Sequence, residues 1–144
     1  MIKIICVGKI KEKYLREGIL DYQQRILKYH KILLVELEDS NMRDESLKIL
    51  KNIDNKDFVI TLDIEGKELS SLQLADKIDK IFISNSNITF VIGGSYGLDK
   101  IVKDRADFSL SFSKMTFPHQ LFRMILLEQI YRVFKILNNE TYHK

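Results

Sequence analysis

Two groups of residues near the carboxyl end of the chain could do chemistry. His119 follows Pro118, where a long helix is expected to begin, and an imidazole can take up or release a proton near neutral pH. The last three residues, Tyr142, His143 and Lys144, could stack on an unpaired base and bind a phosphate. Each group has a plainer alternative, because a lone histidine often caps a helix or fills space and a terminal tail is usually frayed. Both alternatives stay open at this point.

A glycine segment, GGSYG at residues 93–97, could bring the backbone close to a ligand. Gly93 and Gly94 directly follow an apolar run, and glycine has no Cβ to keep a ligand at a distance. A simple tight turn is the alternative. The segment lacks the spacing of the dinucleotide-binding pattern GxGxxG, and the chain contains no Walker, GxSxG or kinase pattern.

Histidine and cysteine give no sign of a metal site. His30, His119, His143 and Cys6 are not spaced as metal ligands are, so we predict no metal, zinc included. The single cysteine excludes an intramolecular disulfide. Cys6 lies inside an apolar run and is expected to be an inert core residue.

The elements that must position these residues alternate along the chain. Period-two and continuous apolar runs predict strands at 2–7, 31–37, 58–62, 88–92 and 108–112. Helical spacing and capping residues predict helices at 13–28, 43–53, 70–82, 99–105 and 118–137. This order is typical of one α/β domain, residues 1–144, with a mostly parallel sheet of about five strands. Ligands bind at the carboxyl ends of such strands, so the loops after Leu62, Ile92 and Phe112 are the first candidates.

Apolar stripes predict which side of each helix is buried. In the helix at 43–53 the stripe contains Leu47 and Leu50. In the helix at 70–82 it consists of Leu72, Ala75, Ile78 and Phe82. The last helix is apolar on nearly every side between Leu121 and Leu137 and therefore needs cover on more than one side. We predict that a second copy of the chain supplies part of it, in a homodimer; complete cover by the chain itself is the alternative.

Charge and hydropathy narrow the class of protein. The net charge is +3, with eight basic residues against three acidic ones in residues 1–31 and five against two in residues 114–144. Two basic ends would suit a phosphate backbone if they meet in space. No apolar run approaches the ~20 residues of a membrane span, and no signal-peptide pattern begins the chain. We therefore expect a cytoplasmic protein that does not enter a membrane.

Taken in order, five motifs resemble those of a known family. They are LDxxGK from Leu62, FVIGGxxG from Phe90, LSxSxMTxPHQ from Leu110, LEQxYR from Leu127 and a closing Tyr-His-basic tail. The sequence resembles the RlmH family of 23S rRNA pseudouridine N3-methyltransferases over essentially its whole length. The resemblance implies a knotted SPOUT fold with a C-terminal trefoil knot. It also implies S-adenosylmethionine as cofactor, a homodimer, and 23S rRNA in the assembled ribosome as substrate.

The resemblance also implies roles for individual residues. Those of the cofactor pocket would be Leu62, Gly93, Phe112, Ser113, Lys114, Met115, Thr116 and Phe117. Catalytic roles fall on His119, Tyr142 and His143, and contacts with substrate RNA on Arg123 and Lys144, the latter standing where the family often has arginine. The tail of one subunit would complete the pocket of the other. Glu128 and Arg132, four apart, are expected to form an ordinary helix ion pair.

Two other functions compete with the enzyme. One is a ribosome-associated dimer that keeps the fold without turnover. The other is a flavodoxin-like protein that binds a nucleotide phosphate at the glycine loop, although such a protein has no need of the LSxSxMTxPHQ segment.

Overall fold

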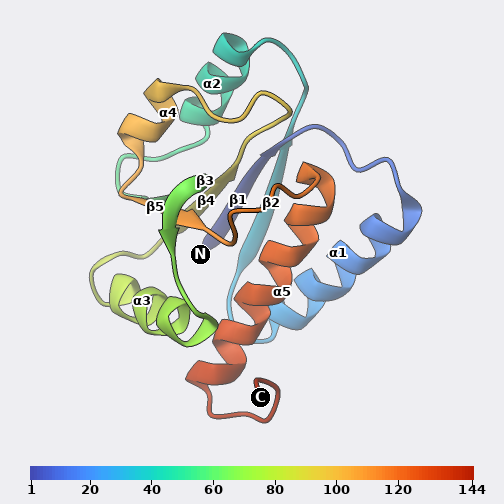
Figure 1. The fold of residues 1–144 in the computed structure, drawn as a ribbon. Helices are drawn as coiled ribbons and strands as arrows, with labels where there is room; N and C mark the ends of the chain where they lie inside the picture. Colours follow the sequence, from blue (N-terminus) through green and yellow to red (C-terminus); the bar gives the residue numbers. More distant parts are fainter.

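Strands and helices alternate along the whole chain, as the sequence predicts. A computed structural model describes residues 1–144 (Figure 1). The strands are β1 (Ile2–Val7), β2 (Ile32–Leu37), β3 (Phe58–Glu68), β4 (Ile88–Ile92) and β5 (Phe108–Ser111). The helices are α1 (Lys13–Leu27), α2 (Met42–Lys51), α3 (Ser71–Ser84), α4 (Lys100–Arg105) and α5 (His119–Leu137).

All five strands are parallel, in the order β2-β1-β4-β3-β5. The central strands β1 and β4 are buried at every position, which explains their continuous apolar sequences. Because the strands run in one direction, all of their carboxyl ends lie at one edge of the sheet. The expected α/β fold with a parallel sheet is confirmed; the trefoil knot stays a prediction.

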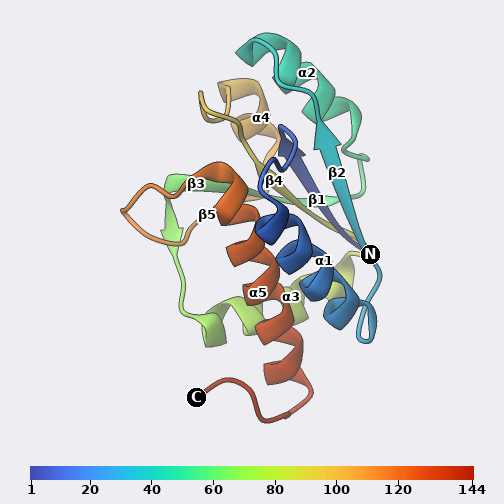
Figure 2. The ribbon, with the colours of Figure 1, turned by 90° about the vertical axis from the view of Figure 1, so that its right-hand side faces the viewer.

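The two faces of the sheet are covered by different helices. Alternate residues of β1 point to opposite faces: Ile2, Ile4 and Cys6 pack in a large core with α1, α3 and α5, whereas Ile5 and Val7 pack in a smaller one with α2 and α4. Figures 1 and 2 show these two helical layers on either side of the sheet. Burial raises the pKa of the Cys6 thiol to about 12, which fits an inert core residue.

Three expectations about the elements need correction. Strand β3 does not end at Leu62 but continues to Glu68, with a break in its pairing with β5 between Leu62 and Lys67. Leu47 and Leu72 are both exposed, Leu72 at 57%. Helix α3 buries Ala75 and Ile78 as predicted, but Leu74 and Ile81 are buried in place of Leu72 and Phe82, because its apolar residues lie on more than one side and packing selects the stripe. In α2, Glu45 is buried and accepts a hydrogen bond from Ser40 N, a contact that no apolar stripe predicts.

Helix α5 obtains most of its cover from its own chain. It lies between α1 and α3, and seven of its residues are buried: Arg123, Leu126, Leu127, Ile130, Tyr131, Val133 and Phe134. The approach to α1 is close, since a side chain at Gly18 would overlap Met124 Sδ. Cover within the chain, the alternative to a dimer, therefore accounts for much of the apolar character of α5, and the homodimer stays a prediction. No helix combines the length and hydropathy needed to cross a membrane.

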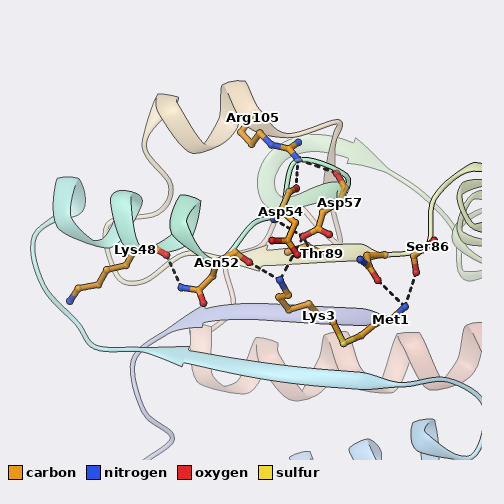
Figure 3. Close-up of polar contacts among 10 residues, drawn as sticks. Met1, Lys3, Lys48, Asn52, Asp54, Asp57, Ser86, Thr89 and Arg105 are labelled. Atoms are coloured by element: carbon orange, nitrogen blue, oxygen red, sulfur yellow. Dashed lines mark hydrogen bonds and ion pairs between the residues drawn. The ribbon is translucent and has the colours of Figure 1, made fainter.

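A buried polar network closes the amino-terminal edge of the sheet (Figure 3). The Asp57 carboxylate accepts hydrogen bonds from Thr89 Oγ1 and Asp54 N, both at 3.0 Å. Lys3 Nζ lies 3.6 Å from the same carboxylate oxygen and donates to the Asn52 carbonyl at 2.7 Å. Asp57 Oδ1 has no hydrogen-bond partner, and Lys3 is the side chain that forms an ion pair with this buried carboxylate.

Arg105 extends the network across the start of β3. Its Nη2 donates to the carbonyls of Asp54 and Asp57 at 3.0 and 3.1 Å. Asp107 accepts from Val59 N at 2.8 Å. These bonds tie the ends of α2 and α4 to the sheet, so this edge serves the stability of the fold.

Replacement of Lys3 should therefore destabilise the protein. Lys3→Met keeps a similar side-chain length but leaves the Asp57 carboxylate buried without a cation, which should lower the free energy of unfolding by about 3–5 kcal/mol. Urea denaturation measures the change. Lys48→Met, which removes an exposed lysine of α2, is the control and should stay within about 0.5 kcal/mol of the native chain. Equal losses in the two variants would contradict the role given to Lys3.

Candidate functional site

A cavity of about 320 Å³ opens at the carboxyl ends of β4 and β5 and at the break in the pairing of β3 after Leu62. Its wall is made by residues 62–64 of β3, by residues from Ile92 to Leu98 after β4, by residues from Leu110 to Phe117 after β5, and by His119 and Phe122 of α5. This is the edge at which parallel sheets bind ligands. The loops after Ile92 and Phe112 line the cavity as the sequence indicates, whereas the segment after Leu62 lies within β3 and not in a loop. The volume is at the lower end of the roughly 300–1,000 Å³ typical of small-molecule sites.

The glycine segment forms a tight turn on the cavity wall. Gly97 N donates to Gly94 O at 3.0 Å, and Gly97 has a φ of +77°, which favours glycine. A Cβ at Gly93 would lie 2.6 Å from Gly97 O, so any side chain there would force the turn open. The tight turn, offered as the alternative, is present and lines the cavity, while close approach to a ligand stays a prediction.

Aromatic rings form the opposite wall. Phe122 meets Phe112 edge to face, with centroids 4.9 Å apart, and stacks on Phe117 at 5.9 Å. The loop between β5 and α5 is held by Ser113, whose hydroxyl accepts from Met115 N at 3.0 Å. The Met115 side chain is 75% exposed at the rim. An apolar slot edged by an exposed methionine is suited to a flat, partly apolar ligand.

Most of the residues expected to bind the cofactor meet at this cavity. Seven of the eight line it: Leu62, Gly93, Phe112, Ser113, Met115, Thr116 and Phe117. Lys114 does not line it, and its side chain is exposed. His119, the first residue of α5, lines the cavity as well. The roles of these residues in binding and catalysis stay predictions, but the fold does bring the residues together around one cavity.

The tail lies at the other end of α5. Helix residues rise about 1.5 Å each, so Arg132 lies roughly 20 Å from His119 along the axis. Arg132 Nη1 is 3.1 Å from His143 Nδ1, and its guanidinium lies over the Tyr142 ring, 4.7 Å from the centroid. Within one chain, therefore, His143 and Tyr142 do not meet His119, and Lys144 does not line the cavity. Figure 1 shows the carboxyl terminus beside the last turns of α5.

Glu128 organises the tail as well as its own helix. The expected pair with Arg132 is present, with Arg132 Nε donating to Glu128 Oε1 at 3.0 Å. Tyr142 Oη donates to the same oxygen at 3.1 Å. Burial first, and then the negative charge of Glu128, raise the pKa of Tyr142 to about 12. The phenol therefore keeps its proton at neutral pH and acts as a donor.

Arg123 does not face solvent, contrary to what its expected contact with substrate requires. Its side chain is fully buried, and its Nη1 donates to Glu36 Oε2 at 2.6 Å. Its Nη2 donates to the carbonyl of Gly8 at 3.1 Å and lies 3.5 Å from that of Val7. The guanidinium thus binds the carboxyl ends of β1 and β2, because α5 crosses the sheet directly over them.

Sequence reasoning missed Phe122 and the ion pair near the cavity. Phe112, Phe117 and Phe122 recur every five residues, a spacing that could have identified the aromatic wall. Lys103 lies 3.2 Å from Asp63, and both line the cavity, but no local pattern links α4 to β3. No group of three potential metal ligands is brought together in the structure.

Comparisons with known proteins agree with this geometry. Residues 1–143 match the family described as predicted SPOUT methyltransferase. The ribosomal RNA large subunit methyltransferases H of Clostridium botulinum and Acetivibrio thermocellus are 50% and 48% identical, each alignment covering 99% of both chains. The crystal structure of tRNA (m1G37) methyltransferase from Aquifex aeolicus superposes with a TM-score of 0.55 at 14% identity, over 92% of this chain and 69% of that one. This last likeness concerns the fold alone.

The family model matches residues 1–143, and the structure has the parallel sheet and the cavity described above. The relatives named above share about half of their residues with this chain over 99% of its length. On these grounds the chain belongs to the SPOUT methyltransferase family, together with the ribosomal RNA large subunit methyltransferases H.

Proposed function

We propose that this protein uses S-adenosylmethionine to methylate N3 of a pseudouridine in 23S rRNA, in the cytoplasm and on the assembled ribosome. As a methyltransferase it requires a methyl donor. The observation that carries the proposal is that the three motif segments, although distant in sequence, build one cavity with His119 at its border. The relatives named for ribosomal RNA supply the class of substrate.

The cavity fits the proposed cofactor in chemical character. The rings of Phe112, Phe117 and Phe122 offer an apolar surface for an adenine, and the loop backbones offer donors and acceptors for its edge. The backbone at Gly93 packs directly against Gly97, so the turn that lines the cavity tolerates no Cβ at this position. When bound, S-adenosylmethionine supplies an electrophilic methyl group on a sulfonium, which leaves as a neutral thioether.

His119 is suited to accept the proton that N3 of the pseudouridine loses. The N3 imide of pseudouridine must lose its proton as the N–C bond forms, and an imidazole at the cavity wall can accept it. His119 also begins a helix of 19 residues whose cap, Pro118, forms no side-chain hydrogen bond. The positive end of the helix dipole would stabilise the imide anion there by about 0.3–1 kcal/mol.

The tail residues enter the proposal through a second copy. His143 and Tyr142 lie at the far end of α5 from the cavity of their own chain, so they can act only on the cavity of a partner. An antiparallel pair of α5 helices in a homodimer would bring each tail toward the opposite His119. Lys144 would then reach substrate phosphate as a point charge, without the planar fork of an arginine.

A binding module without turnover is the second candidate. The favouring observation is that Arg132 and Glu128 engage His143 and Tyr142 within one chain, which leaves the cavity without them. Such a module would bind S-adenosylmethionine and ribosomes but form no product.

Methyl transfer tests the proposed function directly. Purified protein with radiolabelled S-adenosylmethionine should label ribosomes from cells that lack this gene, and mass spectrometry should place the methyl group on N3 of a pseudouridine in 23S rRNA. Ribosomes that already carry the modification are the control and should take up no label. Intact cofactor binding without transfer to ribosomes, subunits or free rRNA would exclude the enzyme and favour the binding module.

The turn at Gly93 should control cofactor affinity. Gly93→Ala places a Cβ against Gly97 O and should weaken binding of S-adenosylmethionine at least about tenfold, roughly 1.4 kcal/mol. Isothermal titration calorimetry measures the affinity, with thermal unfolding to confirm the fold. Gly94→Ala is the comparison, because its Cβ would contact the side chains of Val7 and Glu45 at 3.2 and 3.3 Å and not the Gly97 carbonyl. Native affinity in Gly93→Ala would remove Gly93 from the site.

Mixed dimers should reveal a site built from two chains. His119→Ala and His143→Ala should each inactivate the homodimer. In a heterodimer of the two, one shared site carries both changes and the other carries none, so random mixing should restore about a quarter of native activity. Activity that stays absent after mixing, with subunit exchange verified by mass spectrometry, would show that the tail does not complete a partner's site.

A further inference from the structure

The loop between β1 and α1 carries a row of exposed basic side chains. Lys9, Lys11 and Lys13 are exposed, and Arg16 follows one turn into α1. Ile10 between them is buried and fixes the alternation, so that Lys9 and Lys11 both point outward. Lys13 is 3.8 Å from Glu17, an exposed ion pair, whereas Lys9 and Lys11 form no ion pair.

Backbone hydrogen bonds fasten this loop to the sheet and to α5. Gly8, with a φ of +94°, donates to Leu37 O at 2.7 Å and accepts from the buried Arg123 at 3.1 Å. Lys11 N donates to Gln120 Oε1 at 3.1 Å. The loop is therefore held at two points by the first turns of α5, the same turns that place His119 on the cavity (Figure 2).

An exposed aromatic ring lies beside the lysines. Tyr14 is 67% exposed in the first turn of α1, so its ring is open to a partner. A tyrosine ring offers a stacking surface to an unpaired base or a ribose, and the neighbouring lysines neutralise phosphates. Glu12, also exposed, is the one acidic residue between Lys9 and Lys13.

We propose that Lys9, Lys11 and Tyr14 form a docking surface for the RNA backbone that flanks the target nucleotide, held in register with the cavity by Gln120 and Arg123. This inference rests on the proposed function, since it assumes that RNA reaches the cavity. It explains why a buried arginine and a glutamine on adjacent turns of α5 both bind this one loop.

The test is to remove the two charges while leaving the loop in place. The bonds at Gly8 and at Lys11 N involve loop backbone atoms, so Lys9→Gln/Lys11→Gln does not remove them. The double variant should bind ribosomes on the order of tenfold more weakly. Its logarithmic salt dependence should be less steep by about 1.4–1.8, since each phosphate contact contributes about 0.7–0.9. The KM for ribosomes should rise, while kcat and the affinity for S-adenosylmethionine stay unchanged.

Two controls make the result specific. Lys48→Gln/Lys56→Gln changes the net charge equally, on exposed residues of α2 and the loop before β3, and should bind ribosomes as the native chain does. Lys9→Arg/Lys11→Arg keeps the charge and should restore the affinity and the salt dependence.

Three outcomes would overturn the docking surface while leaving the enzyme intact. One is that Lys9→Gln/Lys11→Gln binds ribosomes with the affinity and the salt dependence of the native chain. Another is a loss of affinity in both pairs alike. The third is a changed oligomeric state, seen by size-exclusion chromatography, with ribosome affinity preserved, which would assign this surface to a second copy of the chain. Failure of the proposed function is separate, because it would appear as no methyl transfer by the native protein.

Discussion

The buried guanidinium of Arg123 is the contact on which the geometry of the site depends. It lies where α5 crosses the carboxyl edge of the sheet, and it binds Glu36 of β2 together with the carbonyls of Val7 and Gly8. A buried charge is costly unless it is paired and hydrogen-bonded, and here Nε alone lacks a partner. Because the fork is planar, it fixes direction as well as distance. The first turns of α5, and with them His119, are thereby fixed relative to β1 and β2.

The amino-terminal edge of the sheet is closed by buried polar contacts. There the network around Asp57 joins Lys3, Thr89 and Arg105 and closes the ends of α2 and α4 against the sheet (Figure 3). Buried polar groups at that edge are directed at one another, whereas at the carboxyl edge the loops leave a cavity lined by backbone and rings. The parallel arrangement allows this difference between the two edges, because the strands all begin at one edge and end at the other. One edge can be closed for stability while the other stays open for a ligand.

The sequence predicts the order of elements well because strands buried on both faces leave continuous apolar runs, as in β1 and β4, whose limits agree with the structure. Prediction from the sequence fails for residues whose burial depends on contacts with distant parts of the chain. Leu72 looks like a core residue until α3 is packed, and Arg123 looks like a surface cation until its partners, more than 80 residues away, are placed. The cavity residues could be indicated because they cluster in short segments after strands. The position of the tail, by contrast, depends on Glu128 and on how the chain turns after α5.

The length of α5 connects these observations. One end of the helix carries His119 and the contacts to the β1–α1 loop, and the other carries the Arg132 and Glu128 contacts to the tail. The middle of α5 packs against α1 and α3, so the helix cannot bend to bring its two ends together. Groups at the two ends of one chain are therefore too far apart to act on the same reacting atom. A chemical step that uses both His119 and His143 would need the tail of a second chain, and this follows from the rigid rise of a helix and not from any sequence motif.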